Sequence, residues 1–140
     1  MLFRFLLLSA ALAAAFPTYA ASAQFKIKKE KVTHSMLLIV EKDNERTIEI
    51  LAGASFRIRL PENASTGYQW AVDHFDGETL ELVSTEPHYG AKALGSGGEV
   101  EFVVKGKRAG AGEIELKKWR QWEGDASVIE RFHLRVNVLP

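Results

Sequence analysis

The sequence contains no cysteine among its 140 residues. This absence excludes a disulfide framework, a thiolate nucleophile, a cysteine-ligated zinc site and a lipid-modified cysteine after a leader. An excess of charge of one sign is also lacking, because 18 basic residues balance 18 acidic ones. Nucleic-acid-binding proteins usually show a basic excess. We therefore expect no cysteine chemistry and no nucleic-acid partner.

Arrangements of residues that would support catalysis are missing as well. The four histidines, His34, His74, His88 and His133, are scattered, and no His-Glu-x-x-His or comparable metal-binding spacing occurs. No serine lies in a nucleophile elbow. We therefore expect a protein that is not an enzyme, with no catalytic residue, no metal site and no other cofactor.

A membrane-spanning helix needs roughly 20 apolar residues, and the sequence has no run of that length. Its longest candidate, Phe5–Phe16, follows Arg4 and is ended by Pro17. Ala21-Ser22-Ala23 then gives the small-x-small pattern that signal peptidases accept. We interpret residues 1–23 as a cleaved signal peptide and expect an exported protein, periplasmic or secreted, without membrane association after cleavage. An uncleaved anchor is the alternative, which the shortness of the run disfavours.

Residues 24–34, which would begin the mature chain at Gln24, form a polar lead-in with four lysines. A patch for an acidic surface is one interpretation, and a solvated, poorly ordered lead-in is the simpler one. Residues 35–140 are enough for one domain with a single core.

From there on, apolar residues recur with a period of two, and no stretch shows a convincing amphipathic helix. In residues 55–60, Phe56, Ile58 and Leu60 point to one face and two arginines to the other. The same alternation occurs in residues 68–72, 80–82, 100–104, 114–116 and 132–138. Strands with one buried face are typical of antiparallel sheets. We predict an all-β fold, an immunoglobulin-like antiparallel β-sandwich of about seven or eight strands, with a small barrel as the alternative.

An earlier pair of segments lies on either side of the turn-prone Asp43-Asn44. These segments are about Met36–Lys42 and Arg46–Leu51. Two short strands around such a turn are typical of a β-hairpin, which we predict here.

Strand parity places three unusual loops at one end of the sandwich. Successive antiparallel strands run in opposite directions, so alternate connections emerge together. The loops around Asn63–Gly67, Pro87–Gly98 and Arg120–Ser127 therefore share one end, and the turns around His74–Glu78 and Gly106–Gly112 share the other. Because function concentrates on loops carried by a rigid scaffold, we predict one composite binding edge at the first end.

In the first loop, Asn63, Ser65 and Thr66 can hydrogen-bond their own backbone, and Gly67 can adopt a positive φ. A plain inter-strand turn is the other interpretation. Asn63-Ala64-Ser65 also matches the N-glycosylation pattern, which is short enough to recur by chance.

The second loop bares its backbone through Gly95, Gly97 and Gly98, which suits close approach by a partner. In the third loop, Arg120 and Trp122 are expected on one side of a strand end. Both residue types are enriched in interface hot spots. Trp70 differs, because it alternates with core positions and is interpreted as packing.

Three motifs then match one family, in order. The segments Asn63-Ala64-Ser65-Thr66-Gly67-Tyr68, Gly95-Ser96-Gly97-Gly98 and Arg120-Gln121-Trp122 resemble the Asn-Pro-Thr-Thr-Gly, Gly-x-Gly-Gly and Arg-Pro-Trp/Phe motifs of chagasin-type inhibitors of papain-like cysteine proteases. The resemblance covers roughly residue 55 to the C-terminus. Ala64 and Gln121 replace the prolines of the family pattern, and Ser65 replaces a threonine, so we expect looser loops and a larger entropy loss on binding.

The resemblance implies an immunoglobulin-like fold and reversible, non-covalent inhibition, with a papain-like cysteine protease as the partner. Residues 63–67 would cover the protease's catalytic cysteine and histidine, with Thr66 nearest the nucleophile. Residues 95–98 would lie beside the non-primed subsites, and Arg120 and Trp122 would contact the opposite wall. The implied protease-binding residues are Asn63, Ala64, Ser65, Thr66, Gly67, Tyr68, Gly95, Ser96, Gly97, Gly98, Arg120, Gln121 and Trp122.

An exported carbohydrate- or protein-binding module without a protease target is the alternative function. A monomer is expected, although exposed strand edges leave a dimer open.

Overall fold

The computed structural model of the chain describes residues 35–89 and 97–140. The expected signal peptide and lead-in, and Gly95 and Ser96 of the second loop, lie outside the described residues. The strands of the described part are β1 (Leu37–Ile39), β2 (Thr47–Leu51), β3 (Ser55–Glu62), β4 (Gln69–Phe75), β5 (Leu80–Tyr89), β6 (Gly98–Gly106), β7 (Gly110–Trp119) and β8 (Glu130–Leu139). Its short 3₁₀ helices are η1 (Glu41–Asp43), η2 (Ala64–Thr66), η3 (Gln121–Glu123) and η4 (Asp125–Ser127). None of the helices within these ranges is long and apolar enough to cross a bilayer.

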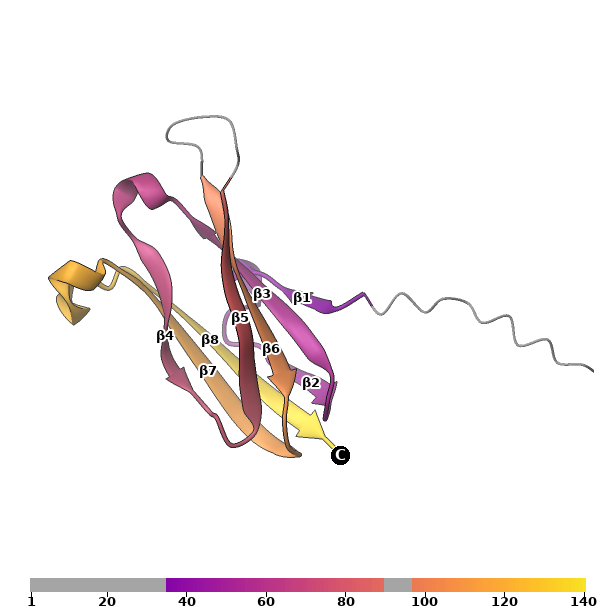
Figure 1. The fold of residues 1–140 in the computed structure, drawn as a ribbon. Helices are drawn as coiled ribbons and strands as arrows, with labels where there is room; N and C mark the ends of the chain where they lie inside the picture. Colours follow the sequence, from indigo (N-terminus) through magenta and orange to yellow (C-terminus); the bar gives the residue numbers. More distant parts are fainter. Residues whose placement is uncertain (1–34, 90–96) are drawn as a thin grey trace, which may run out of the picture. The chain divides into compact units, whose positions relative to one another are not determined.

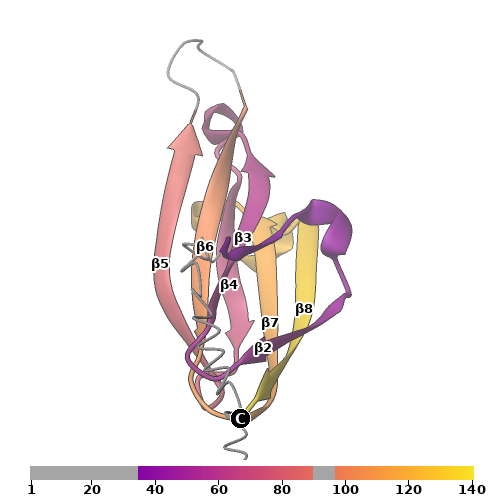
Figure 2. The same ribbon diagram turned by 90° about the vertical axis from the view of Figure 1, so that its right-hand side faces the viewer.

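The strands form two four-stranded sheets that lie in two layers (Figures 1 and 2). One sheet has the order β1-β3-β6-β5 and the other the order β2-β8-β7-β4. Neighbouring strands from β3 onward pair antiparallel. This architecture confirms the predicted all-β, immunoglobulin-like sandwich of about eight strands.

The apolar side chains that recur with a period of two fill the space between the sheets. Phe56, Ile58 and Leu60 of β3 are completely buried, and so are Leu134 and Val136 of β8. Fully burying a side chain of this kind contributes about 1.5–3 kcal/mol relative to leaving it exposed. Interleaved arginines on β3 remain on the outer face, where the carboxylate of Glu101 pairs with them. Alternation along each strand therefore decides which face packs on the other sheet.

The predicted N-terminal hairpin is wrong. β1 pairs parallel with β3 in one sheet, whereas β2 pairs parallel with β8 in the other. Between them, η1 carries the chain from sheet to sheet, and the Asp43 carboxylate accepts a hydrogen bond from the Val40 N–H at 2.9 Å. The turn residues are present, but the cap redirects the chain across the sandwich instead of folding it back.

The second connection is shorter than predicted, because the paired strands continue past Pro87. Pro87 lies opposite Val100, and Tyr89 lies opposite Gly98. A proline is tolerated there because β5 is an edge strand. β5 also shifts register between Leu82 and Ser84. Leu82 on this edge strand is 38% exposed, although its alternation predicted a buried side chain.

Loop parity is as predicted for the first and third loops. The helix η2, between β3 and β4, and the η3–η4 segment, between β7 and β8, both lie at the end of the sandwich away from the C-terminus (Figure 1). The ends of β5 and β6 reach the same end, because Gly98 pairs with both Glu62 and Tyr89. We call this end the loop end.

Candidate functional site

The first loop, residues 63–68, is a tight turn held by its own side chains. The Asn63 carboxamide oxygen accepts hydrogen bonds from the Ser65 N–H at 3.1 Å and the Ser65 hydroxyl at 2.6 Å. The Thr66 hydroxyl donates to the Asn63 carbonyl at 2.7 Å. Ala64, Ser65 and Thr66 nevertheless remain exposed. The loop is therefore ordered from within and open to a partner, as its Asn, Ser and Thr content predicted.

Gly67 ends the turn in the left-handed region, with φ +76°. A β-carbon on Gly67 would lie 2.5 Å from Cη2 of Trp122, so the indole packs directly on this glycine. Two requirements, a positive φ and close approach of a ring, therefore explain glycine at this position.

Arg120 connects the third loop to the first. Its guanidinium donates to the Thr66 carbonyl from Nε at 3.2 Å and from Nη2 at 3.0 Å, and lies 4.4 Å from the centre of the Tyr68 ring. Nη1 reaches Glu123 at 3.2 Å. The sequence suggested that Arg120 would face a partner, but most of its donors are used inside the molecule. These contacts hold the first loop against the third.

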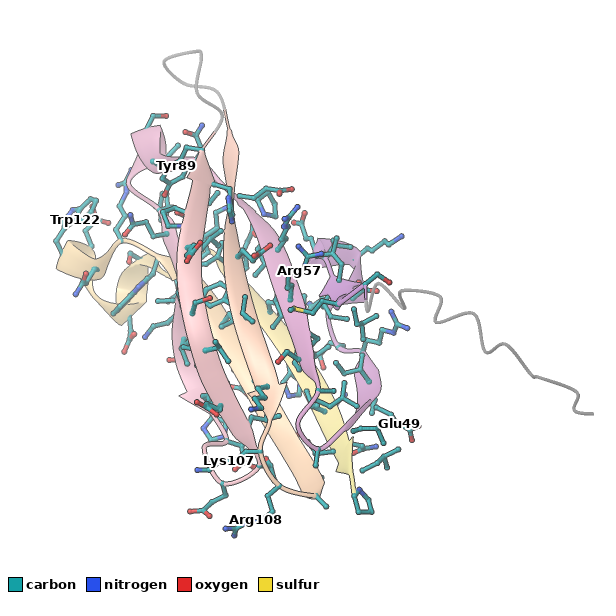
Figure 3. All side chains as sticks on the ribbon, turned by 45° about the vertical axis from the view of Figure 1, so that its right-hand side comes forward. Glu49, Arg57, Tyr89, Lys107, Arg108 and Trp122 are labelled. Carbon is teal, nitrogen blue, oxygen red and sulfur yellow. The ribbon has the colours of Figure 1, made fainter. Side chains whose placement is uncertain are left out.

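The third loop is not a strand end, so strand alternation does not place Arg120 and Trp122, although both side chains reach the first loop, at Thr66 and at Gly67. Arg120 follows the last residue of β7, and Gln121 and Trp122 belong to η3. The helical turn points Arg120 at the first loop and leaves Trp122 70% exposed (Figure 3). Trp70, in contrast, is 6% exposed and joins the core, as its alternation predicted.

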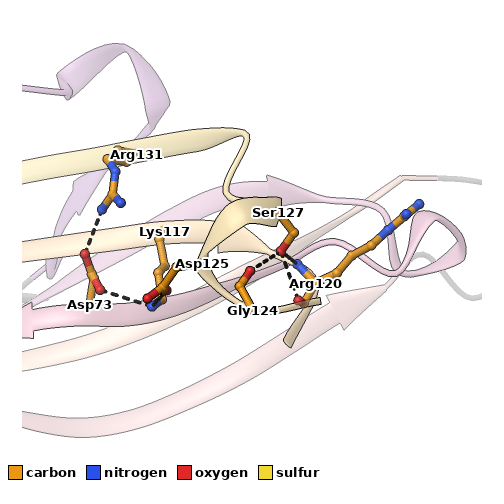
Figure 4. A network of polar contacts seen from close by, with 7 residues as sticks. All are labelled: Asp73, Lys117, Arg120, Gly124, Asp125, Ser127 and Arg131. Atoms are coloured by element: carbon orange, nitrogen blue, oxygen red, sulfur yellow. Dashed lines mark hydrogen bonds and ion pairs between the residues drawn. The ribbon is translucent and has the colours of Figure 1, made fainter. Parts of the chain in front are cut away.

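A polar network fixes the base of the third loop (Figure 4). Lys117 of β7 lies 2.8 Å from the Asp125 carboxylate and 3.1 Å from that of Asp73, which also contacts Arg131 at 2.7 Å. The hydrogen bond to Asp125 is the main cause that raises the pKa of Lys117. Hydrogen bonds from Arg131 and then Lys117 lower the pKa of Asp73.

Ser127 completes this base. Its hydroxyl oxygen accepts from the Arg120 N–H at 2.9 Å. Its single proton has two carbonyl acceptors in range, Gly124 at 2.6 Å and Arg120 at 3.0 Å (Figure 4). The loop that carries Trp122 is therefore tied down at both of its ends.

Of the second motif, the structure describes only Gly97 and Gly98. Gly97 is exposed, and a β-carbon there would meet nothing within 4 Å. Gly98 is the first residue of β6 and lies against Tyr89. The two glycines therefore have different surroundings, although the sequence analysis predicted the same role, close approach by a partner, for both.

Sequence reasoning missed Glu62, which is 4% exposed at the end of β3. Its carboxylate accepts hydrogen bonds from the Trp70 N–H at 2.8 Å and the Tyr89 hydroxyl at 2.5 Å. A signal was present, because Glu62 continues the inward positions of Phe56, Ile58 and Leu60. The ion pairs of Lys117 had no comparable signal, because the folding of the third loop brings Asp125 to it and the pairing of β4 with β7 brings Asp73.

Within the described ranges, one group of side chains has the composition of a metal site. Ligand atoms of Glu113, Glu115 and His133 lie within 4.8 Å of one another on β7 and β8. Glu45 already takes Nδ1 of His133 at 2.9 Å, and Arg135 lies 3.4 Å from Glu45 and 3.9 Å from Glu113. The hydrogen bond from His133 is the main cause that lowers the pKa of Glu45. Glu45 and Arg135 thus contact two members of this cluster, whereas the buried Nε2 of His133 has no hydrogen-bond partner among the described residues and lies 3.7 Å from Glu113. The cluster takes no part in the loop end.

The loop end thus exposes three features, the turn at residues 64–66, the indole of Trp122 and the backbone at Gly97. Hydrogen bonds and ion pairs within the molecule hold the first and third loops in place. A sequence model described as chagasin family peptidase inhibitor matches residues 49–136, which include all three motifs. Amoebiasin-1 of Entamoeba histolytica is 35% identical over 102 residues, which cover 71% of this chain and 97% of that protein. Chagasin of Trypanosoma cruzi is 32% identical over 109 residues, which cover 71% of this chain and 96% of that protein.

A solved structure supports the fold. The crystal structure of the cysteine protease inhibitor EhICP2 from Entamoeba histolytica has a TM-score of 0.68 and 22% identity, and the match covers 74% of this chain and 96% of that chain. The chain therefore belongs to the chagasin family of peptidase inhibitors and, as the sequence predicted, is an inhibitor and not an enzyme.

Proposed function

We propose that this peptidase inhibitor acts on papain-like cysteine proteases by inserting its loop end into their active-site cleft. The observation that carries the proposal is the first loop itself. It is exposed at Ala64, Ser65 and Thr66, yet Arg120 fixes the Thr66 carbonyl and Trp122 covers Gly67. A loop ordered before binding loses little entropy on entering a narrow cleft.

The shape of the first loop explains how it would block a protease without being cut. Residues 64–66 form a 3₁₀ turn whose Thr66 N–H and Gly67 N–H donate back to the Asn63 and Ala64 carbonyls, each at 3.1 Å. A turn closed on itself does not present an extended peptide to the catalytic cysteine. The chain has no cysteine of its own, so disulfide formation with the nucleophile is excluded. Inhibition would therefore be reversible and non-covalent.

The third loop would supply the hydrophobic contact. Trp122 is the most exposed of the large hydrophobic side chains in the described part of the chain, and an exposed tryptophan on a fixed base is typical of an interface hot spot. In this proposal Trp122 contacts a wall of the cleft, whereas Arg120 serves the first loop. Gly97, with open space around it, would bring backbone against the opposite wall.

Titration of the mature chain against papain, with a small peptide substrate present, tests the proposal. We expect competitive inhibition, and we expect the inhibitor to survive long incubation intact. Thr66→Arg should abolish inhibition, because the cleft would have to bury a long side chain and an unpaired charge. Lys107→Ala, at the other end of the sandwich, is the matched control (Figure 3). Non-competitive inhibition, or full inhibition by Thr66→Arg, would move the contact to another face.

We also propose that the protein works outside the cytoplasm, in the periplasm or the medium. Arg4, the apolar run Phe5–Phe16 and Ala21-Ser22-Ala23 support export with cleavage.

A further inference from the structure

Three residues lie at one level across three neighbouring strands at the loop end. Gly98 of β6 pairs with Glu62 of β3 on one side and with Tyr89 of β5 on the other. Tyr89 and Glu62 are thus separated by a whole strand. Their side chains nevertheless meet, because the Tyr89 hydroxyl donates to Glu62 Oε1 at 2.5 Å.

The missing side chain of Gly98 makes this contact sterically accessible. A β-carbon on Gly98 would lie 2.5 Å from Cδ1 of Tyr89 and 2.8 Å from the His88 carbonyl oxygen. The tyrosine ring occupies the space that any other residue at position 98 would need. An aromatic ring laid over a cross-strand glycine is a known means of pinning strand register.

Glu62 also links this sheet to the other one, because it binds Trp70 of β4. Its other carboxylate oxygen accepts the Trp70 N–H at 2.8 Å, and the Trp70 indole N–H donates to the neighbouring Pro61 carbonyl at 3.0 Å. Glu62 immediately precedes the first loop and Trp70 lies just after it. One buried carboxylate therefore closes the base of the first loop and joins it to the end of β5.

We infer that Glu62 and Tyr89 are positioning residues for inhibition. Their hydrogen bond, which we call the Tyr89–Glu62 bridge, fixes the first loop relative to the ends of β5 and β6. Gly98 is required by the bridge and not by contact with a protease. The inference rests on the proposed function, and it identifies a source of loop order in a chain that has Ala64 and Gln121 where the family pattern has prolines.

A double-mutant cycle tests the bridge, with inhibition of papain measured well below the melting temperature of each variant. Tyr89→Phe keeps the ring over Gly98 and removes the hydroxyl, and should raise the inhibition constant roughly tenfold, the effect of a hydrogen bond to a charged group. Glu62→Met should weaken inhibition at least as much. The double variant should be no weaker than Glu62→Met, because the two changes remove the same bond. Lys107→Met, which removes a hydrogen bond to Gly77 at the opposite end, is the control.

Nuclear magnetic resonance separates positioning from general stability. In Tyr89→Phe the amide signals of Thr66 and Gly67 should shift, while those of Lys107 and Arg108 stay in place. The chemical shifts of the Gly98 α-protons should show the ring current of residue 89 in the wild type and in Tyr89→Phe. They should change in Tyr89→Leu, which has no ring.

Independent, additive effects of Tyr89→Phe and Glu62→Met, or unchanged inhibition by Tyr89→Phe, would overturn the inference while leaving the proposed function intact. A wild-type chain that shows the Gly98 ring effect but does not inhibit papain would instead refute the proposed function, and with it the role of the bridge in inhibition.

Discussion

The indole of Trp122 lies directly on Gly67, so close that a β-carbon at Gly67 would come within 2.5 Å of the ring. The contact joins the third loop to the first, and Arg120 joins the same two loops through the Thr66 carbonyl. The two loops therefore act as one surface, and a change in either should be felt in the other.

Gly67→Ala should weaken inhibition by more than tenfold. An alanine in the left-handed region costs about 1–2 kcal/mol, and its β-carbon would also displace Trp122. The inhibition constant for papain measures the effect, and thermal melting reports the accompanying loss of stability. Gly77→Ala is the matched control, because a β-carbon there meets nothing within 4 Å. Equal inhibition by both variants would show that the Trp122–Gly67 contact is dispensable.

Trp122→Ala and Trp70→Ala should have opposite effects. Trp122 is 70% exposed, so its loss should weaken binding by about 2–4 kcal/mol and barely change the melting temperature. Trp70 is 6% exposed, so its loss should lower the free energy of unfolding by about 3–5 kcal/mol. Chemical denaturation and protease titration of both variants measure the two quantities. A Trp122→Ala chain that unfolds but binds normally when folded would contradict the assignment of Trp122 to the interface.

Ala64→Pro should tighten inhibition by about 0.4–1 kcal/mol by reducing the freedom of the unbound loop. Ala64 is the first residue of η2, where proline is favoured. Asn63 before it is extended, with φ −118° and ψ 101°, as a residue preceding proline must be. The inhibition constants of the variant and the wild type, compared under the same conditions, decide the point. Weaker inhibition would mean that the loop must adjust on binding.

Acid should destabilise the base of the third loop through Asp73. Arg131 and Lys117 hold the pKa of Asp73 below its ordinary value of 3.8. A lowered folded-state pKa gives stability that is present above the unfolded-state value and is lost as pH falls through the folded-state value. The melting temperature should therefore drop as pH falls below about 3.8. Asp73→Asn should be less stable than wild type at neutral pH and should show a shallower acid decline, whereas Glu49→Gln on β2 should follow the wild type.

Mass spectrometry of the protein isolated from its native source should find Gln24, or a residue close to it, at the N-terminus. The prediction rests on the small residues at Ala21 and Ala23 after the apolar run. An Ala23→Arg variant should accumulate as an uncleaved precursor. A mature form that retains Met1 would contradict export by this route.

Sequence periodicity was sufficient for the sandwich because its strands are half-buried. The alternation at Phe56, Ile58 and Leu60 and at Leu134 and Val136 is the packing pattern itself. The hairpin prediction was wrong because turn residues at Asp43-Asn44 indicate only that the chain changes direction. They do not indicate which sheet the next strand joins. Both neighbours of that turn pair with strands distant in sequence.

The site shows the same division. Asn63 and Gly67 act through local bonds and local backbone geometry, so the sequence predicted their behaviour. Arg120 does not, because its partner Thr66 is distant in sequence and only the folded sandwich brings them together. Glu62 was predictable in part, since a carboxylate on the inward face of a strand requires donors, but the donors themselves come from β4 and β5.

The pairing of β2 with β8 has a consequence for how the chain is completed. β2 comes early in the described domain, and β8 ends at Leu139, yet their residues lie side by side along all of β2. A sheet edge that pairs an early strand with the last strand of the described domain cannot form until β8 has emerged, and contacts this distant in sequence form slowly. A chain that crosses a membrane N-terminus first would thus lack the β2–β8 pairing, and so remain incompletely folded, during the crossing. Pairing of β2 would begin only when residues 130–139 arrive. The arrival of β8 would therefore set the time at which this sheet is completed.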